Sequence, residues 1–402
     1  MLEIQAGWKR LDHSRTAIDE SSGPSALVIA LTLVINRARP RRLDVTMSPT
    51  GTVSTLKGIV AFCLLLTGLL LVGTAQSQSA RAQGIWSIKA PLPTPRFDVG
   101  VATLNGKIYV LGGGAPGVTA SQLNQEYDPA TDRWRERAPI PQGVTHGGVA
   151  GASGKIYVIG GFTASIHAVA VDNVFEYNVA TDAWRQLPPI NSPRGSVGVA
   201  VLNGKVHAIG GRGLNNVTVA THEVYDPVTN KWSQAAPLPA ARDHIGVIVL
   251  GGRIHVIGGR ISNHIVDNSK PTEGARGLPY DLVTNGPNTT LHDVYDPATN
   301  SWRSTAPLPT ARSNGAAVYY HGLILYAGGE CKRPNPKGGG DTFDENEAYD
   351  PKTNRWLTLV PLPAGRQGFG AAALGQYAYF TGGSLGCGGG PASDQLLVFR
   401  LP

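Results

Sequence analysis

The sequence predicts an all-β fold assembled from six copies of one four-stranded antiparallel unit. Its 402 residues include 51 glycines and 29 prolines, a content typical of a chain with many tight turns. Only 16% of the residues are charged and 42% are hydrophobic, which argues against disorder. Six Gly-Gly pairs recur along the chain, and a tryptophan lies 26 residues before each pair. This regular spacing indicates internal repeats.

The repeats have a constant frame and one segment of variable length. The Gly-Gly pairs begin at Gly112, Gly160, Gly210, Gly258, Gly328 and Gly382. The tryptophans of the frame are Trp86, Trp134, Trp184, Trp232, Trp302 and Trp356. The distance from a Gly-Gly pair to the next tryptophan varies, with values of 22, 24, 22, 44 and 28 residues. All variation in length therefore falls in the loop that follows Gly-Gly.

Each repeat contains four short segments with the composition of strands. In the first repeat they are GVATL at 100–104, KIYVLGG at 107–113, QEYDP at 125–129 and RWRERAP at 133–139. Asn105-Gly106 predicts a two-residue hairpin turn between the first two strands. The segment Asp128–Asp132 begins with Asp-Pro, which favours a type I turn between the last two. We therefore expect a four-stranded meander in every repeat.

The order Gly-Gly, Tyr-Asp-Pro turn and Trp resembles the kelch repeat, and the resemblance extends over residues 85–402. It implies a six-bladed β-propeller with one repeat per blade. The sixth repeat ends in DQLLVFRLP without a turn or tryptophan, whereas the segment from Ile85 to Ile88 supplies an isolated strand before the first repeat. We expect this N-terminal strand to pair with the three C-terminal strands and close the ring, because closure removes exposed sheet edges.

The N-terminal region predicts export. Residues 47–82 combine a basic Lys57, an apolar run from Ile59 to Val72 and small residues, the order of a secretory signal peptide. A membrane anchor is the alternative, but 14 residues are short for a span of about 20. We expect residues 83–402 to be a periplasmic or secreted propeller of the exported bacterial type, without a stable anchor after cleavage. The role of residues 1–46 is uncertain, and one hypothesis is that Met47 is the true start.

Charge and motifs exclude several classes of function. Residues 83–402 hold 26 basic and 23 acidic groups, with no basic stripe that would indicate a nucleic-acid partner. The sequence contains no phosphate-binding glycine loop, no zinc spacing of Cys and His, and no GxSxG element. Nor does it match the Tyr–Cys pair and His ligands of a galactose-oxidase-type copper enzyme. We expect a monomer without metal or cofactor.

Two sets of equivalent positions are candidates for the interior of the ring. The first set, 16 residues before Gly-Gly, contains five arginines, for which we expect a structural role. The second set, 14 residues before Gly-Gly, consists of Asp98, His146, Ser196, His244, Asn314 and Gly368. The resemblance implies that residues at the start of the inner strand line a pocket, so we predict ligand binding by Asp98, His146, Ser196 and Asn314. Polar groups around channel water are the alternative.

Charged residues directly after the Gly-Gly pairs extend this candidate site. Arg212 and Arg260 follow two neighbouring pairs and are predicted to bind a ligand carboxylate with forked hydrogen bonds. If the protein is an enzyme, Glu330 and His244 are candidates for proton donor and acceptor. The alternative is that these charges have partners of their own. Cys331 and Cys387 lie in loops of neighbouring blades and are predicted to form a disulfide.

Two functions are consistent with these features. The first is a binding module that recognises a protein, peptide or glycan on the face that carries the variable loops, where function concentrates on rigid scaffolds. The second is a sugar-acting enzyme, since exported kelch propellers include a sialic acid mutarotase. The long loop 261–291 is either a lid over the channel or a mobile segment.

Overall fold

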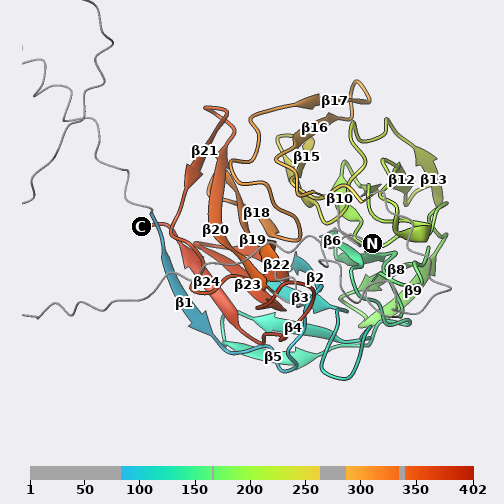
Figure 1. Cartoon of the computed structure of the whole chain (residues 1–402). Helices are drawn as coiled ribbons and strands as arrows, with labels where there is room; N and C mark the ends of the chain where they lie inside the picture. Colours follow the sequence, from blue (N-terminus) through green and yellow to red (C-terminus); the bar gives the residue numbers. More distant parts are fainter. Residues whose placement is uncertain (1–82, 165–166, 263–286, 335–339) are drawn as a thin grey trace, which may run out of the picture. The chain divides into compact units, whose positions relative to one another are not determined.

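The computed structural model describes residues 83–402, except 165–166, 263–286 and 335–339. The predicted signal peptide, residues 1–46 and most of the long loop 261–291 lie outside the described residues. Six four-stranded antiparallel sheets follow one another along the described part, as Figure 1 shows. In that part, no helix has the length and apolar character of a membrane span. Its single helical element is a 3-10 turn, η1 (Leu214–Asn216).

The first three blades are built from consecutive strands. Blade one contains β2 (Gly100–Leu104), β3 (Lys107–Leu111), β4 (Asn124–Asp128) and β5 (Arg133–Glu136). Blade two contains β6 (Gly148–Ala152), β7 (Lys155–Ile159), β8 (Val174–Asn178) and β9 (Ala183–Leu187). Blade three contains β10 (Gly198–Leu202), β11 (Lys205–Ile209), β12 (His222–Asp226) and β13 (Lys231–Gln234).

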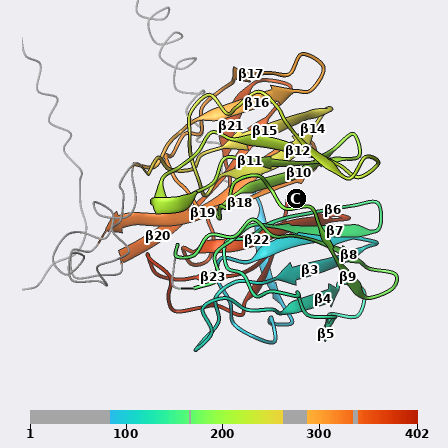
Figure 2. The same cartoon turned by 90° about the vertical axis from the view of Figure 1, so that its right-hand side faces the viewer.

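The remaining blades follow the same order with two differences. Blade four contains β14 (Gly246–Leu250), β15 (Arg253–Ile257), β16 (His292–Asp296) and β17 (Ser301–Ser304). Blade five contains β18 (Ala316–Tyr320), β19 (Leu323–Pro334), β20 (Gly340–Asp350) and β21 (Arg355–Thr358). Blade six contains β22 (Gln367–Leu374), β23 (Tyr377–Ser384), β24 (Leu396–Arg400) and, from the other end of the chain, β1 (Ile85–Lys89). The long β19–β20 hairpin projects from one side of the propeller (Figure 2).

The ring closes as the sequence predicts. Strand β1 pairs antiparallel with β24, with Trp86 opposite Phe399, and completes the sheet of β22, β23 and β24. Each inner strand also contacts the inner strand of the next blade, and β22 contacts β2. The described hydrophobic residues form six buried clusters, each shared by two neighbouring blades. The fold is therefore a six-bladed β-propeller whose core lies between the blades.

The repeated turns and tryptophans join each blade to the one before it. Asn105 and Gly106 both have positive φ, at 50° and 72°, as an Asn-Gly hairpin turn requires. The indole of Trp134 donates to the carbonyl of Ala90 at 2.9 Å, and Asp132 accepts from the amide of the same residue. The other five frame tryptophans likewise donate to a backbone carbonyl of the preceding blade. These hydrogen bonds give the frame tryptophans a structural role.

The Gly-Gly pairs permit close approach of neighbouring backbones. In blade one, Gly112 and Gly113 have φ of 61° and 89°. A Cβ at Gly112 would lie 2.6 Å from the carbonyl oxygen of Val144 in the next blade, and one at Gly113 would lie 2.6 Å from that of Phe97. Only glycine fits both the conformation and the space.

Candidate functional site

Six equivalent residues form a ring at the centre of the propeller, each two residues before an inner strand or, in blade six, within it. All six have a left-handed backbone, with φ from 52° to 62°. They are the residues that the sequence analysis aligned: Asp98, His146, Ser196, His244, Asn314 and Gly368. Asp, Asn and His tolerate positive φ better than other side chains, and glycine tolerates it best. The backbone conformation therefore explains much of the polar composition of this ring.

A closed circle of backbone hydrogen bonds connects these six positions. The amide of each ring residue donates to the carbonyl of the ring residue in the preceding blade, at N–O distances from 2.5 to 3.4 Å. The circle closes where Asp98 donates to Gly368. Each blade is thus fixed to the next at the axis, and each ring side chain has a rigid attachment point.

The ring residues and the residues that follow them line an axial cavity of about 150 Å³. Asp98, His146, Ser196, His244 and Asn314 contribute polar side chains to this lining. Among the described residues, this cavity lies where the sequence analysis places a ligand. Its volume leaves room for several water molecules or for part of a sugar-sized ligand.

The arginines that precede the ring are structural. Arg96, Arg194, Arg242, Arg312 and Arg366 are fully buried. Each donates to the carbonyl of the first glycine in its own Gly-Gly pair, as Arg194 does to Gly210 at 3.0 Å. Each also bonds a carboxylate or amide side chain, which lies in the third strand of the blade or, for Arg366, just before it at Gln395. Arg242, for example, is bonded to Asp293 at 2.8 Å. They hold the strained Gly-Gly segments in place.

Arg212 and Arg260 are brought together around a carboxylate of the protein itself. Both side chains are buried, and Asp243 lies between them. Arg212 Nε is 2.6 Å from Asp243 Oδ2, and Arg260 Nε is 3.2 Å from Asp243 Oδ1. Burial raises the pKa of Asp243, but the two guanidiniums and His244 outweigh it and hold the pKa well below its usual range. The sequence analysis predicts that these arginines bind the carboxylate of a ligand. In the structure both arginines bind the carboxylate of Asp243, a partner that the sequence analysis did not identify.

His244 forms a dyad with the same carboxylate. Its Nδ1 donates to Asp243 Oδ1, which places the lone pair on Nε2. Burial, followed by the charge of Arg260, lowers the pKa of His244 to about 4, so the ring is neutral at pH 7. Its Nε2 lies 3.2 Å from Ser196 Oγ and 3.2 Å from Arg260 Nη2.

Asp98, His146 and Asn314 form a second hydrogen-bonded group in the ring, next to this dyad. His146 Nε2 lies 3.1 Å from Asp98 Oδ2, and Asn314 Nδ2 donates to Asp98 Oδ1 at 3.0 Å. Burial is the main reason that the pKa of Asp98 rises to about 7. Burial also holds the pKa of His146 well below 6.5. This group therefore has a carboxyl that titrates near neutrality.

Glu330 and His244 do not face each other across open space. Arg260 lies between them, with Nη1 bonded to Glu330 and Nη2 to His244. Glu330 is 4% exposed, and its neighbour Cys331 forms a disulfide with Cys387, with the Cα atoms 4.9 Å apart. The candidate proton donor and acceptor are therefore bridged by a guanidinium.

The structure adds two residues that the sequence analysis missed. His167, in the variable loop of blade two, contacts Arg212 through Nδ1 at 3.1 Å and His244 through Nε2 at 3.3 Å. Ser262, after β15, accepts from Arg212 at 2.6 Å. Both lie outside the repeated frame, so alignment of the repeats gives no signal for them. Asp243 lies within the frame, and its signal is that no other blade has a carboxylate at that position.

Comparisons with known proteins agree with this architecture. A family model described as the KLHDC2/KLHL20/DRC7 kelch-repeats domain matches residues 74–259, just under half of the chain. Kelch-like protein 23 of Mus musculus is 31% identical over 106 residues, which is 26% of this chain and 18% of that protein. Kelch-like protein 15 of Danio rerio is 31% identical over 101 residues, which is 25% of this chain and 16% of that protein. The matched stretch therefore spans less than a fifth of these relatives.

A solved structure extends the likeness to most of the chain. The structure of YjhT superposes with a TM-score of 0.60 and covers 77% of this chain and 96% of that one. At 19% sequence identity, it shows the fold alone. Together with the six blades and their Gly-Gly and tryptophan frame, these matches show a six-bladed β-propeller whose repeats are similar to kelch repeats.

Proposed function

We propose that the protein is an exported binding module that recognises a glycan or a sugar acid on the loop face, at the axial cavity. The observation that supports this proposal is the ring of polar side chains that lines the cavity. Ser196, Asn314 and the neutral ring of His146 offer uncharged hydrogen-bonding groups, and Asp98 offers a carboxyl whose pKa burial raises to about 7. Such a mixture suits hydroxyl and carboxyl groups better than the apolar side chains of a peptide.

Two further features support export and a monomeric state. The Cys331–Cys387 disulfide is typical of an oxidising compartment, in agreement with the signal peptide expected at residues 47–82. The closed ring leaves no sheet edge between the first and last blades for pairing with a second copy. We propose a periplasmic or secreted protein without a nucleic-acid partner.

Binding is tested with a panel of neutral sugars and sugar acids, by calorimetry or by ligand-observed NMR. Because the ring backbone is left-handed, Ser196→Gly and Asn314→Gly remove side chains without adding backbone strain. We expect each variant to weaken binding about tenfold, the effect of one lost hydrogen bond. The matched control is Asn203→Gly, an exposed residue of the same conformation in a hairpin turn at the other end of the strands.

A peptide that binds where no sugar does would contradict the glycan proposal and favour a protein partner. Binding that is unchanged in both ring variants would place the ligand elsewhere on the propeller. A loss of binding in Ser196→Gly or Asn314→Gly supports the site only if Asn203→Gly still binds as the wild type does.

A second candidate function is a sugar-acting enzyme of the mutarotase type. It is favoured by the Asp243–His244 dyad, which leaves a neutral base in a buried site, with Glu330 bonded to the same guanidinium. Mutarotation of a sugar acid, followed by NMR, is expected to slow at least ~100-fold in Glu330→Gln, in line with loss of acid–base catalysis. Glu136→Gln, which changes an exposed carboxylate of β5, is the control. Equal rates with and without wild-type protein would exclude this activity for the sugars tested.

A further inference from the structure

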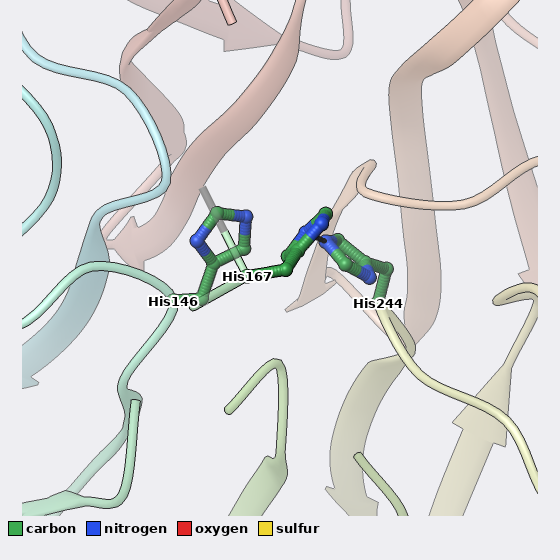
Figure 3. A group of neighbouring side chains, drawn as sticks. All are labelled: His146, His167 and His244. Carbon is green, nitrogen blue, oxygen red and sulfur yellow. Dashed lines mark hydrogen bonds between the residues drawn. The ribbon is translucent and has the colours of Figure 1, made fainter. Parts of the chain in front are cut away.

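Three histidines converge at the loop-face side of the ring (Figure 3). His146 and His244 come from ring positions in blades two and four, and His167 comes from the loop between β7 and β8. One ring nitrogen of each lies within 4.8 Å of those of the other two. All three are buried, with 5–8% of their surface exposed. The three histidines are far apart in the sequence and form no short metal-binding motif. The sequence analysis therefore expects no metal.

Two of the histidines already have the outer partners typical of metal ligands. Asp243 accepts from Nδ1 of His244, and Asp98 contacts Nε2 of His146 at 3.1 Å. In metal sites, a carboxylate on the second ring nitrogen fixes the tautomer and makes the ligating nitrogen more basic. The ligating atom of His244 is then Nε2, which is turned toward His167 at 3.3 Å.

His244 Nε2 is crowded by neighbouring polar groups, and one of them, Arg260 Nη2, also lies 3.4 Å from His167 Nε2. The single lone pair of His244 Nε2 is approached by Ser196 Oγ at 3.2 Å, Arg260 Nη2 at 3.2 Å and His167 Nε2 at 3.3 Å. Only one donor can be well satisfied by one lone pair. A zinc ion 2.0–2.1 Å from two imidazole nitrogens at a tetrahedral angle places those nitrogens roughly 3.3 Å apart. The two Nε2 atoms are already at this separation.

The local charge permits a divalent ion together with an anionic ligand. Arg212 and Arg260 lie beside the cluster and oppose a cation, whereas Asp98, Asp243 and Glu330 favour one. A dication added to two guanidiniums and three carboxylates leaves one positive charge, which a bound hydroxide or ligand carboxylate neutralises. Binding through His167 Nε2 moves its proton to Nδ1, and Arg212 then depends on Asp243 and Ser262 as its other partners.

We propose that His146, His167 and His244 bind one divalent first-row transition-metal ion, with Zn²⁺ as the best fit. Neutral imidazole is a preferred ligand of Zn²⁺, and three protein ligands leave a fourth position open. His146 and His244 are also among the residues that line the axial cavity. The proposal does not depend on a sugar ligand, and it goes beyond the proposed function.

The test is a titration of the untagged, chelator-treated protein with Zn²⁺ by calorimetry, together with visible spectroscopy after addition of Co²⁺. Because all three histidines have positive φ, from 53° to 60°, each is replaced by asparagine, which tolerates that backbone. His321→Asn is the matched control, because His321 is exposed and has φ of 49°. Circular dichroism and thermal unfolding establish that each variant is folded.

We expect one Zn²⁺ per wild-type chain and the intense absorption of tetrahedral Co²⁺. Each of the three substitutions is expected to weaken binding by more than the ~10–100-fold that loss of an outer partner costs, and His321→Asn is expected to bind as wild type does. Absence of Zn²⁺ binding to the wild type, or unchanged binding in all three variants, would overturn the proposal. If the variants fail to fold, a weak octahedral Co²⁺ spectrum of the wild type would also overturn the proposal.

Discussion

At the scale of single residues, the left-handed backbone of the ring decides which side chains can line the cavity. Asp98, His146, Ser196, His244 and Asn314 all adopt φ above 50°, and glycine takes the sixth place. A β-branched residue at these positions would be strained whatever space it had. The ring is therefore polar partly for conformational reasons, independently of any ligand.

The glycine of the ring gives a direct test of this packing. A Cβ at Gly368 would lie 2.3 Å from Asp98 Oδ1, whereas a Cβ at Gly375, with nearly the same φ, would meet nothing within 4 Å. We expect Gly368→Ala to lower the free energy of unfolding by about 2–4 kcal/mol, from strain and overpacking together. Gly375→Ala is expected to cost only ~1–2 kcal/mol. Urea unfolding of both variants measures the difference, and equal losses would contradict the close contact.

The sequence predicts the ring residues but not the contacts between them. Because the six positions share one place in a constant repeat, counting from Gly-Gly is enough to align Asp98 with Asn314. The position of His167 depends on the path of a variable loop, which no repeat determines. The pairing of Arg212 and Arg260 with Asp243 was not predicted either, although no other blade has a carboxylate at the position of Asp243.

At the scale of strands, blades three and four share a buried pair of histidines between their second and third strands. In blade three, Nδ1 of His207 lies 2.9 Å from Nε2 of His222, and Nδ1 of His222 lies 3.1 Å from the carbonyl of Ala236. In blade four, His255 and His292 repeat this arrangement. All four histidines are buried, which is consistent with a packing role.

These pairs predict loss of stability in mild acid. Burial lowers the pKa of His207 to about 3 and that of His222 to about 4, below the ordinary value of 6.5. The native state therefore resists protonation, so the stabilisation is complete above pH 6.5 and is lost as the pH falls toward 4. We expect each pair to contribute about 1–3 kcal/mol to this loss.

The measurement compares denaturant unfolding at pH 7.5 and pH 4.5. A double variant, His207→Tyr with His222→Asn, introduces the residues that blade one has at these two positions, Tyr109 and Asn124. Its stability is expected to depend less on pH than that of the wild type, since one pair has been removed. Equal pH dependence in both proteins would show that the pair does not cause the acid sensitivity.

The strands themselves are well predicted, and their exceptions have local causes. The segment GVATL corresponds to β2 residue for residue, because Asn-Gly and Asp-Pro turns mark where strands end. The extension of β19 and β20 beyond the Gly-Gly pair is not predicted. It occurs with register shifts after Ala327 and Gly329, and such irregularities have no simple sequence pattern.

At the scale of the whole molecule, closure of the ring depends on a strand of only five residues. Trp86 of β1 packs against Phe380 and Phe399, with ring centroids 5.3 and 4.9 Å away. Deletion of Ile85–Lys89 removes this packing and exposes the edge of β24. We expect a loss of at least ~3 kcal/mol and a tendency to associate, measured by thermal unfolding and light scattering. A monomer with wild-type stability would show that β1 is not needed for closure.

The disulfide connects blades five and six in the same ring. Cys331 and Cys387 are 56 residues apart in the sequence, and in the chain-entropy model a loop of this length contributes about 4 kcal/mol. We expect Cys331→Ser with Cys387→Ser to lower the free energy of unfolding by up to that amount, measured by guanidinium unfolding. Addition of reductant to the wild type is expected to have a similar effect and to leave the double variant unchanged.

The circle of backbone bonds at the axis has a consequence for redesign. Because the amides and carbonyls of that circle are main-chain groups, exchanging Asn, Asp, His, Ser or Gly among positions 98, 146, 196, 244 and 314 does not remove any donor or acceptor of the circle. Position 368 is the exception and requires glycine, because a Cβ there would lie 2.3 Å from Asp98 Oδ1. A combinatorial library limited to those amino acids at these five positions would sample new specificities while the propeller fold is preserved.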